Sequence, residues 1–84
     1  MNTRVVVTGG AGFIGRETIR KLVISGYDVL CFDLAEQIER HKNILSEIAL
    51  LGKLTLTHGS ILDRNSLRDA MNGADLVIHL AAML

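Results

Sequence analysis

The hydrophobic positions of this chain form two kinds of pattern that alternate along its length. Short apolar runs, the first of them rich in β-branched residues, indicate strands that are buried in a sheet. These runs cover residues 4–8, 27–33, 54–57 and 75–81. Longer segments in which apolar residues recur at i, i+3 and i+4 indicate helices with one buried face. These segments cover residues 13–25, 35–51 and 63–72.

The predicted order of elements is therefore β-α-β-α-β-α-β. Strands that alternate with helices pair in parallel through right-handed crossovers. The fold class that follows is α/β, an open doubly wound parallel sheet.

The composition limits the classes of function. An 84-residue chain forms one domain at most, and 49% hydrophobic residues exclude disorder caused by low hydrophobicity. Lys plus Arg and Asp plus Glu number 9 each, so the zero net charge excludes nucleic-acid or anionic-membrane binding based on bulk charge. A single cysteine, Cys31, excludes an intramolecular disulfide framework and a cysteine-only zinc site.

No feature of the chain indicates export, a membrane or a metal. No apolar run approaches the ~18 residues of a membrane span, and residues 1–4 do not begin a secretory signal. The three histidines lack metal-ligand spacing. Cys31 is interpreted as an inert core thiol and His79 as a satisfied core or rim histidine. We expect a cytoplasmic protein with no metal site, no nucleic-acid partner and no membrane partner.

The strongest motif is Thr8-Gly-Gly-Ala-Gly-Phe-Ile-Gly15, which follows a predicted strand and opens a predicted helix. It satisfies both G-x-G-x-x-G, starting at Gly10, and T-G-x-x-G-x-x-G, starting at Thr8. A helix N-terminus offers unpaired backbone N–H groups and partial positive charge to a pyrophosphate, and glycine lets the phosphates approach the backbone. The alternative, a tight turn without a ligand, is disfavoured by the strand–loop–helix context.

Asp33 ends the second predicted strand, 18 residues after Gly15. A carboxylate there can accept hydrogen bonds from both hydroxyls of an adenosine ribose, and it would repel a 2′-phosphate. The next residues, Leu34, Ala35 and Glu36, include no Arg or Lys, so we predict NAD rather than NADP. Leu34 is included in the predicted site. The alternative is that Asp33 only caps the following helix, although the two roles can coexist.

Together these features resemble the N-terminal part of an extended short-chain dehydrogenase/reductase, from the group of NAD-dependent nucleotide-sugar epimerases and dehydratases. The resemblance covers nearly the whole chain and rests on the glycine motif, Asp33 and the segment Ile-His-Leu-Ala-Ala at 78–82. It implies a Rossmann-like sheet with strand order 3-2-1-4, cut short after the fourth strand. Residues 1–84 would then be a partial NAD(P)-binding domain, with the substrate domain absent.

The resemblance also implies a role for each matching residue. Three loop glycines shape the turn, the N–H groups of Phe13 and Ile14 face the pyrophosphate, and residues 80–82 line the cleft near the ribose and nicotinamide. The implied cofactor-binding residues are Gly9, Gly12, Phe13, Ile14, Gly15, Asp33, Leu34, Ser60, Ile61, Leu80, Ala81 and Ala82.

One departure from the family pattern follows the third strand. The family commonly has Gly-Asp-Ile there, whose acid contacts the adenine amino group, whereas this chain has Gly59-Ser60-Ile61. Ser60 can still form a hydrogen bond but carries no charge, and Ile61 can still contact the adenine ring. We therefore expect weaker or rearranged adenine recognition, with an ordinary loop serine as the alternative role of Ser60.

The family's chemistry needs a Tyr-x-x-x-Lys pair, which these residues lack. The only tyrosine, Tyr27, stands four residues before Cys31, at the strand end away from the cleft. No catalytic residue is therefore predicted. We expect the NAD-binding part of a sugar-nucleotide epimerase/dehydratase or related oxidoreductase, as a fragment of a longer enzyme. The alternatives are a non-catalytic NAD(H)-binding module and a self-associating fragment.

The fourth strand is expected to favour self-association. In the order 3-2-1-4 it is an edge strand, and residues 76–80 are apolar with no charge to block pairing. Only the helix at 63–72 is expected on one face of the sheet. We therefore predict a homo-oligomer that forms through the fourth strand or the uncovered face.

Overall fold

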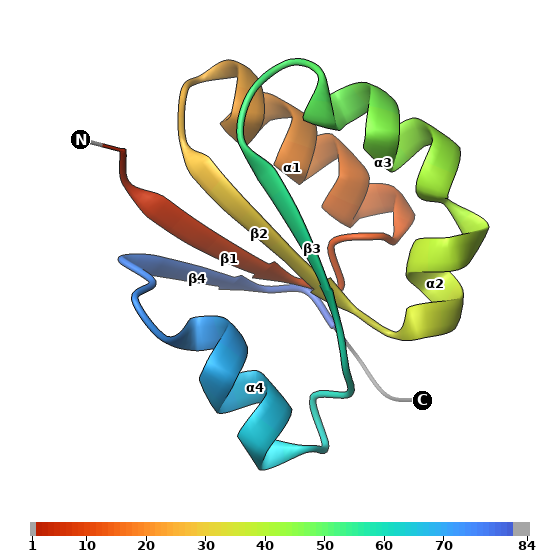
Figure 1. The fold of residues 1–84 in the computed structure, drawn as a ribbon, viewed down its shortest axis with the longest axis vertical. Coiled ribbons are helices and arrows are strands. Elements are labelled where there is room, and N and C mark those ends of the chain that lie inside the picture. Colours follow the sequence, from red (N-terminus) through yellow and green to blue (C-terminus); the bar gives the residue numbers. More distant parts are fainter. Residues whose placement is uncertain (1, 82–84) are drawn as a thin grey trace.

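In the computed structural model, which describes residues 2–81, strands and helices follow the predicted order with one additional helix. The elements are β1 (Arg4–Thr8), α1 (Phe13–Ile24), β2 (Asp28–Asp33), α2 (Ala35–Arg40), α3 (Lys42–Ala49), β3 (Leu54–His58), α4 (Arg64–Met71) and β4 (Leu76–His79). The strands form one parallel sheet in the order β3-β2-β1-β4 (Figure 1). The predicted α/β class and the Rossmann-like strand order 3-2-1-4 are confirmed.

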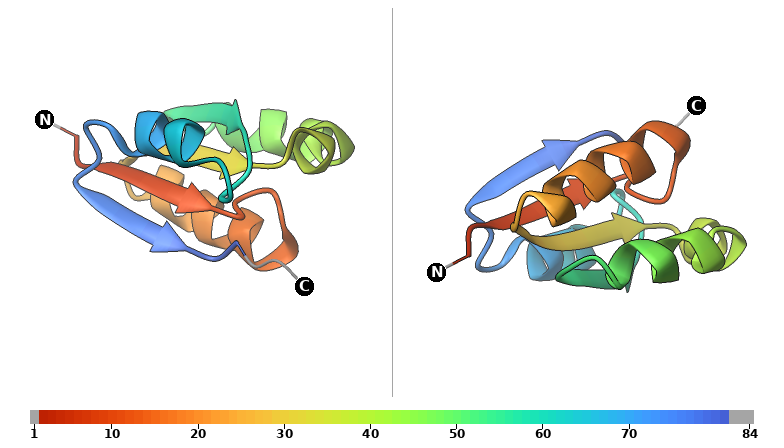
Figure 2. Two further views of the ribbon diagram at one scale, coloured as in Figure 1. Left: turned by 90° about the horizontal axis from the view of Figure 1, so that it is seen from below. Right: turned by 90° about the horizontal axis from the view of Figure 1, so that it is seen from above.

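Two hydrophobic clusters, one on each face of the sheet, hold the helices in place. Successive side chains of a strand point to opposite faces. Val7 therefore packs with Ile19 of α1 and Leu45 of α3, whereas Val6 packs with Ala70 of α4. The central strands β1 and β2 are buried on both faces, as their apolar runs predict, and the edge strands are more exposed. Figure 2 shows β4 on the opposite side of the molecule from α2 and α3.

The prediction of a single helix over residues 35–51 is wrong, because the segment forms two helices that are separated at His41. His41 leaves the helical region, with φ −111° and ψ 18°. α3 buries Leu45 and Ile48 in the cluster that includes α1, whereas α2 has no buried residue and follows directly on β2. Because of this break the two helices have different positions. α3 packs against the sheet and α1, whereas α2 lies at the carboxyl end of β2.

The register of the sheet brings the carboxyl ends of its strands together. Thr8 at the end of β1 pairs with Phe32 of β2 and with His79 of β4, and Asp33 pairs with His58 of β3. β4 ends at His79, two residues earlier than the predicted end at residue 81. The chain therefore leaves the sheet beside the glycine motif.

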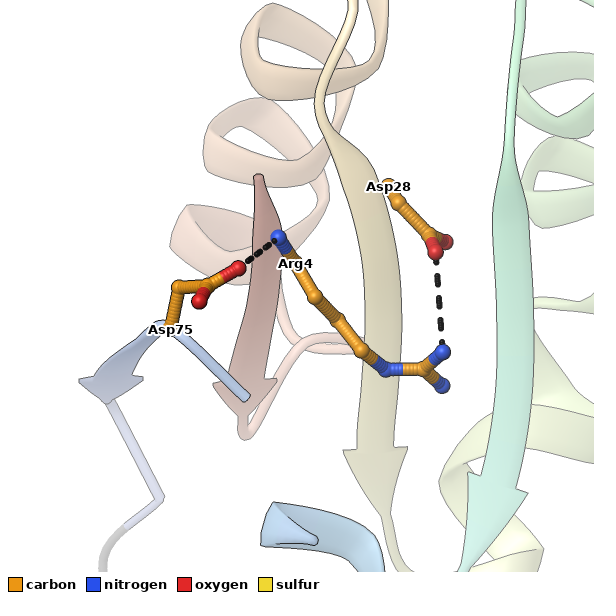
Figure 3. Close-up of polar contacts among 3 residues, drawn as sticks. All are labelled: Arg4, Asp28 and Asp75. Atoms are coloured by element: carbon orange, nitrogen blue, oxygen red, sulfur yellow. Dashed lines mark hydrogen bonds and ion pairs between the residues drawn. The ribbon is translucent and has the colours of Figure 1, made fainter. Parts of the chain in front are cut away.

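At the amino ends of the strands, Arg4 connects β1 to β2 and to the residue that precedes β4 (Figure 3). Its backbone N–H donates to Asp75 Oδ2 at 2.8 Å, and its Nη1 lies 3.5 Å from Asp28 Oδ2. The backbone N–H groups of Asp75 and Asp28 donate in turn to the oxygens of Arg4 and Thr3. The side chains of the Arg4–Asp28 pair are 32% and 28% exposed, so the ion pair itself contributes little to stability.

Candidate functional site

α1 begins at Phe13, directly after the glycine motif, and no side chain caps it. Its N-cap residue is Gly12, which has φ −71° and ψ 176° and no side chain that could accept a hydrogen bond. The first-turn N–H groups, which include those of Phe13 and Ile14, therefore have no capping side chain and carry the positive end of the helix dipole. An anion is the ligand that matches this helix start chemically.

The glycines of the motif are required for different physical reasons. Gly9 has φ +71°, and a Cβ there would lie 2.7 Å from the backbone nitrogen of Ala81. A Cβ on Gly15 would overlap the backbone oxygen of Gly9, so α1 can start this close to the turn only with glycine. A Cβ on Gly12 would meet only the Gly9 oxygen, at 3.4 Å. Gly9 and Gly15 therefore serve the fold, whereas Gly12 leaves space free for a ligand.

The Asp33 carboxylate, at the end of β2, is hydrogen-bonded to the glycine motif. Oδ2 accepts a hydrogen bond from the Ala11 N–H at 2.9 Å, and Oδ1 accepts one from the Leu34 N–H at 2.7 Å. Each carboxylate oxygen keeps a further lone pair that can accept a hydroxyl proton. The N-cap residue of α2 is Leu34, and no side chain caps that helix, so the capping role considered for Asp33 is not observed.

A cleft of about 300 Å³ lies between the glycine motif and the carboxyl ends of the strands. Its lining residues are Gly9, Gly12, Phe32, Asp33, Leu34, Gln37, Gly59, Ile61, Leu80 and Ala81. Most of the residues predicted for the cofactor site are therefore brought together in one place. Ligands of doubly wound sheets bind at this end of the strands.

The other predicted site residues do not line the cleft or fall outside the described range. Residues 13–15 form the first turn of α1, next to the cleft. Ser60 is absent from the lining, and its Oγ accepts a hydrogen bond from the Leu62 N–H at 3.1 Å, as a loop serine does. Ala82 lies outside the described residues.

Sequence reasoning missed three of the lining residues, Phe32, Gln37 and Gly59. A Cβ on Gly59 would lie 2.8 Å from ring atoms of Phe32, so this glycine lets the loop after β3 approach the ring. Gln37 lies in the first turn of α2, four residues after Asp33. The predicted start of a helix directly after Asp33 was a signal that could have found Gln37, because that first turn must stay near the strand end.

Arg16 is bonded to the same turn residue as Asp33. Nη1 of Arg16 donates to the backbone oxygen of Ala11, the residue whose N–H binds Asp33, at 2.7 Å. Desolvation lowers the pKa of His41, the charges of Arg16 and Arg40 lower it further, and Asp33 acts in the opposite direction. One positive charge that the sequence directly after Asp33 does not indicate, that of Arg16, is therefore held at the same turn residue as the carboxylate.

Other chemistry within residues 2–81 is limited. Burial raises the pKa of the Cys31 thiol to about 12, with a smaller contribution from Asp33, so this thiol stays protonated and unreactive. In this range no group of three or more His, Cys, Asp and Glu side chains is placed to hold a metal ion. Within the same range no helix has both the length and the apolar character that a bilayer span requires.

Comparison with known proteins identifies a family and several relatives. The model of the "NAD dependent epimerase/dehydratase family" matches residues 5–84. The chain is 39% identical over 84 residues to the UDP-N-acetyl-alpha-D-glucosaminuronate decarboxylase of Bacillus cytotoxicus, a match that covers 100% of the chain and 25% of the relative. It is 34% identical over 80 residues to the decarboxylating sterol-4-alpha-carboxylate 3-dehydrogenase of Dictyostelium discoideum. That match covers 95% of the chain and 22% of the relative. The chain thus spans about a quarter of the length of these relatives.

A solved structure with the same fold carries a dinucleotide. The chain is similar to AtPrR2 with NADP+ and (+)pinoresinol, with a TM-score of 0.78 and 27% identity, covering 100% of this chain and 27% of that one. The match covers the whole chain, including the glycine motif and the strand ends, and the dinucleotide named with that structure is NADP+.

Proposed function

Because the chain belongs to the NAD dependent epimerase/dehydratase family, we propose that its 84 residues bind NAD(H) in the cleft at the carboxyl ends of the strands. The observation that carries this proposal is that the uncapped start of α1 and the Asp33 carboxylate meet at one cleft. The helix start matches a diphosphate, and the carboxylate matches the hydroxyls of a ribose.

The groups that remain free around the cleft fit the parts of the dinucleotide. The diphosphate would lie against the first-turn N–H groups of α1, because Gly12 has no side chain to keep it away. The adenosine ribose would donate its hydroxyl protons to the free lone pairs of Asp33. The adenine would contact Ile61, and Leu80 and Ala81 would line the path toward the nicotinamide.

We further propose that NAD is preferred over NADP. A 2′-phosphate on the adenosine ribose would bring its negative charge close to Asp33, and like charges at that distance repel each other. Arg16, which is bonded to the same turn residue as Asp33, reduces this repulsion. The preference is therefore expected to be smaller than the sequence around Asp33 alone predicts.

The 84 residues are proposed to hold the cofactor without turning over a substrate. They contain no Tyr-x-x-x-Lys pair, and Tyr27 precedes β2 at the amino end of the sheet, away from the cleft. We propose that they form the cofactor-binding part of a cytoplasmic sugar-nucleotide epimerase/dehydratase or related oxidoreductase. A non-catalytic NAD(H)-binding module is the second candidate, favoured by the same missing pair.

Calorimetric titration of NAD into the 84-residue chain and its Gly12→Val variant tests the site. The valine side chain would occupy the space in front of α1, and we expect at least about a 100-fold loss of affinity. Because the φ and ψ of Gly12 suit any residue, the melting temperature should stay close to that of the unchanged chain. Ser25→Val, which adds the same side chain at the exposed C-cap of α1, is the matched control.

Two outcomes would contradict the proposal. An unchanged chain that binds neither NAD nor NADH would rule out the function. Undiminished NAD affinity in Gly12→Val would rule out the location of the diphosphate.

We also propose that the 84-residue chain forms homo-oligomers through β4. This edge strand and the residue after it expose Leu76, Val77 and Leu80 by 54%, 41% and 39%. An apolar strand edge without charged residues is a template for pairing with a second copy. Sedimentation at micromolar concentration should give a dimer or larger species, and Val77→Lys should give monomers. A monomeric unchanged chain would contradict this proposal.

A further inference from the structure

A buried hydroxyl at the end of β1 is connected to the far wall of the cleft. Thr8 is fully buried, and its Oγ1 lies 2.7 Å from Nδ1 of His79 on β4. The same oxygen accepts a hydrogen bond from the Ala81 N–H at 3.3 Å. The backbone oxygen of Thr8 accepts another from the Leu80 N–H at 3.0 Å. Thr8 thus holds the two residues, Leu80 and Ala81, that line the cleft after β4.

The direction of these bonds follows from what each group can donate. An amide N–H can only donate, so Thr8 Oγ1 is the acceptor in its bond with Ala81. The hydroxyl has one proton, and within residues 2–81 its remaining hydrogen-bond partner is Nδ1 of His79. A buried hydroxyl proton needs an acceptor. Nδ1 of His79 fits this acceptor role in the ring tautomer that carries its proton on Nε2.

Ala81 depends on this bond because it lies beyond the backbone ladder of the sheet. β4 ends at His79, which pairs with Thr8 in the parallel register, so both side chains lie on the same face. Two residues later the Ala81 N–H has a side-chain hydroxyl as its partner rather than a strand carbonyl. The backbone of Ala81 also packs so closely on Gly9 that a Cβ on this glycine would clash with it.

We propose that His79 is a positioning residue for the cofactor cleft, an inference that rests on the function proposed above. Its Nδ1 accepts the Thr8 hydroxyl proton and thereby keeps the lone pairs of Oγ1 directed at the Ala81 N–H. Without this acceptor the hydroxyl turns to find another partner, and its bond to Ala81 weakens. The wall formed by Leu80 and Ala81 then loses its fixed position beside Gly9.

NMR spectroscopy of the 84-residue chain without cofactor tests the bonds themselves. The ring nitrogen shifts of His79 should report the Nε2–H tautomer at neutral pH. The Ala81 amide should exchange faster in His79→Leu and Thr8→Val. Protection should persist in His79→Asn, whose Oδ1 can replace Nδ1 as the acceptor, and in Thr8→Ser, which keeps the hydroxyl. An Nδ1–H tautomer, or unchanged Ala81 protection in His79→Leu, would overturn the proposal.

NAD titrations of the same variants test the consequence for the cleft. The Kd should rise about tenfold in His79→Leu and Thr8→Val, and stay within about threefold of the unchanged chain in His79→Asn, as expected for one partly buried hydrogen bond. An equal loss in His79→Asn and His79→Leu would show that Nδ1 is not the group that acts. If the unchanged chain binds no NAD, the proposed function fails, while the tautomer and the Ala81 amide still decide the role of His79.

Discussion

β2 begins and ends with an aspartate, and the two carboxylates have different kinds of partner. Asp28 at the amino end lies against the Arg4 guanidinium, and its backbone N–H donates to the oxygen of Thr3, just before β1. Asp33 at the carboxyl end accepts two backbone N–H groups and lines an open cleft. At the amino end the charged groups pair with one another, although the buried Nε of Arg4 has no partner within residues 2–81. At the carboxyl end acceptor lone pairs and helix N–H groups are left for a ligand.

The contrast teaches that an acidic residue at a strand end is not by itself a binding signal. Both aspartates flank the same buried strand. Before Asp28 the last turn of α1 is already closed, because the N–H groups of Ser25 and Gly26 bind its final carbonyls. Asp33 instead faces the uncapped start of α1. The carboxylate alone does not tell a structural site from a candidate ligand site. The difference lies in the end of α1 nearby, which is capped before Asp28 and uncapped beside Asp33.

Gly15→Ala should give the largest effect. The added methyl group would overlap the backbone oxygen of Gly9, and the turn cannot yield without moving the start of α1. We expect a loss of roughly 2–4 kcal/mol in the free energy of unfolding, measured by urea denaturation, and loss of NAD binding with it. Gly12→Ala, where space is free, should change the free energy of unfolding by no more than about 0.5 kcal/mol. Equal losses in both variants would contradict the different roles given to these glycines.

Asp33→Asn should have an intermediate effect that is confined to the cleft. The change removes the charge and one acceptor, and hydrogen bonds to charged groups contribute ~1.5–3 kcal/mol, so NAD affinity should fall about tenfold or more. Repulsion of the 2′-phosphate should fall as well, so the ratio of the NADP Kd to the NAD Kd should decrease. Calorimetry with both cofactors measures the two effects. A preference that survives unchanged would show that Asp33 does not contact the ribose.

Asp28→Asn should have the smallest effect, and it is the matched control for the same substitution at the other end of β2. The ion pair with Arg4 is about one-third exposed, and such pairs contribute ~0–1 kcal/mol to stability. NAD affinity should not change, because Asp28 lies at the opposite end of the sheet. A loss of affinity similar to that of Asp33→Asn would mean that the two ends of the strand are not functionally distinct.

The parts of the fold that could be predicted from the sequence are those set by local patterns. β1 and β2 were recognisable because burial on both faces demands continuous apolar runs, and the glycine motif marked the turn into α1. The break at His41 was not predictable, because apolar spacing continues through it and only packing of the following helix on α1 requires it. The end of β4 at His79 was not predictable either, because the apolar pattern continues past it to residue 81.

The candidate site was predictable where it rests on the motif and less so where it rests on distant pairing. Gly12 and Asp33 were predicted, because a strand end followed by a helix start is visible in the sequence. Gln37 was missed, because the sequence placed it in a long helix without showing where that helix points. The bond between Thr8 and His79 joins residues 71 positions apart, and only the register of the parallel strands brings them together.

Titration of NAD into the ¹⁵N-labelled chain, followed by the chemical shifts of its backbone amides, tests the central claim most directly. If the diphosphate lies at the start of α1 and the ribose at Asp33, the amides of Phe13, Ile14 and Leu34 should show the largest shifts at saturation. The claim would be contradicted if NAD left these three amides unmoved, or if the largest shifts fell in the groove between α1 and α3, around Arg20 and Leu51.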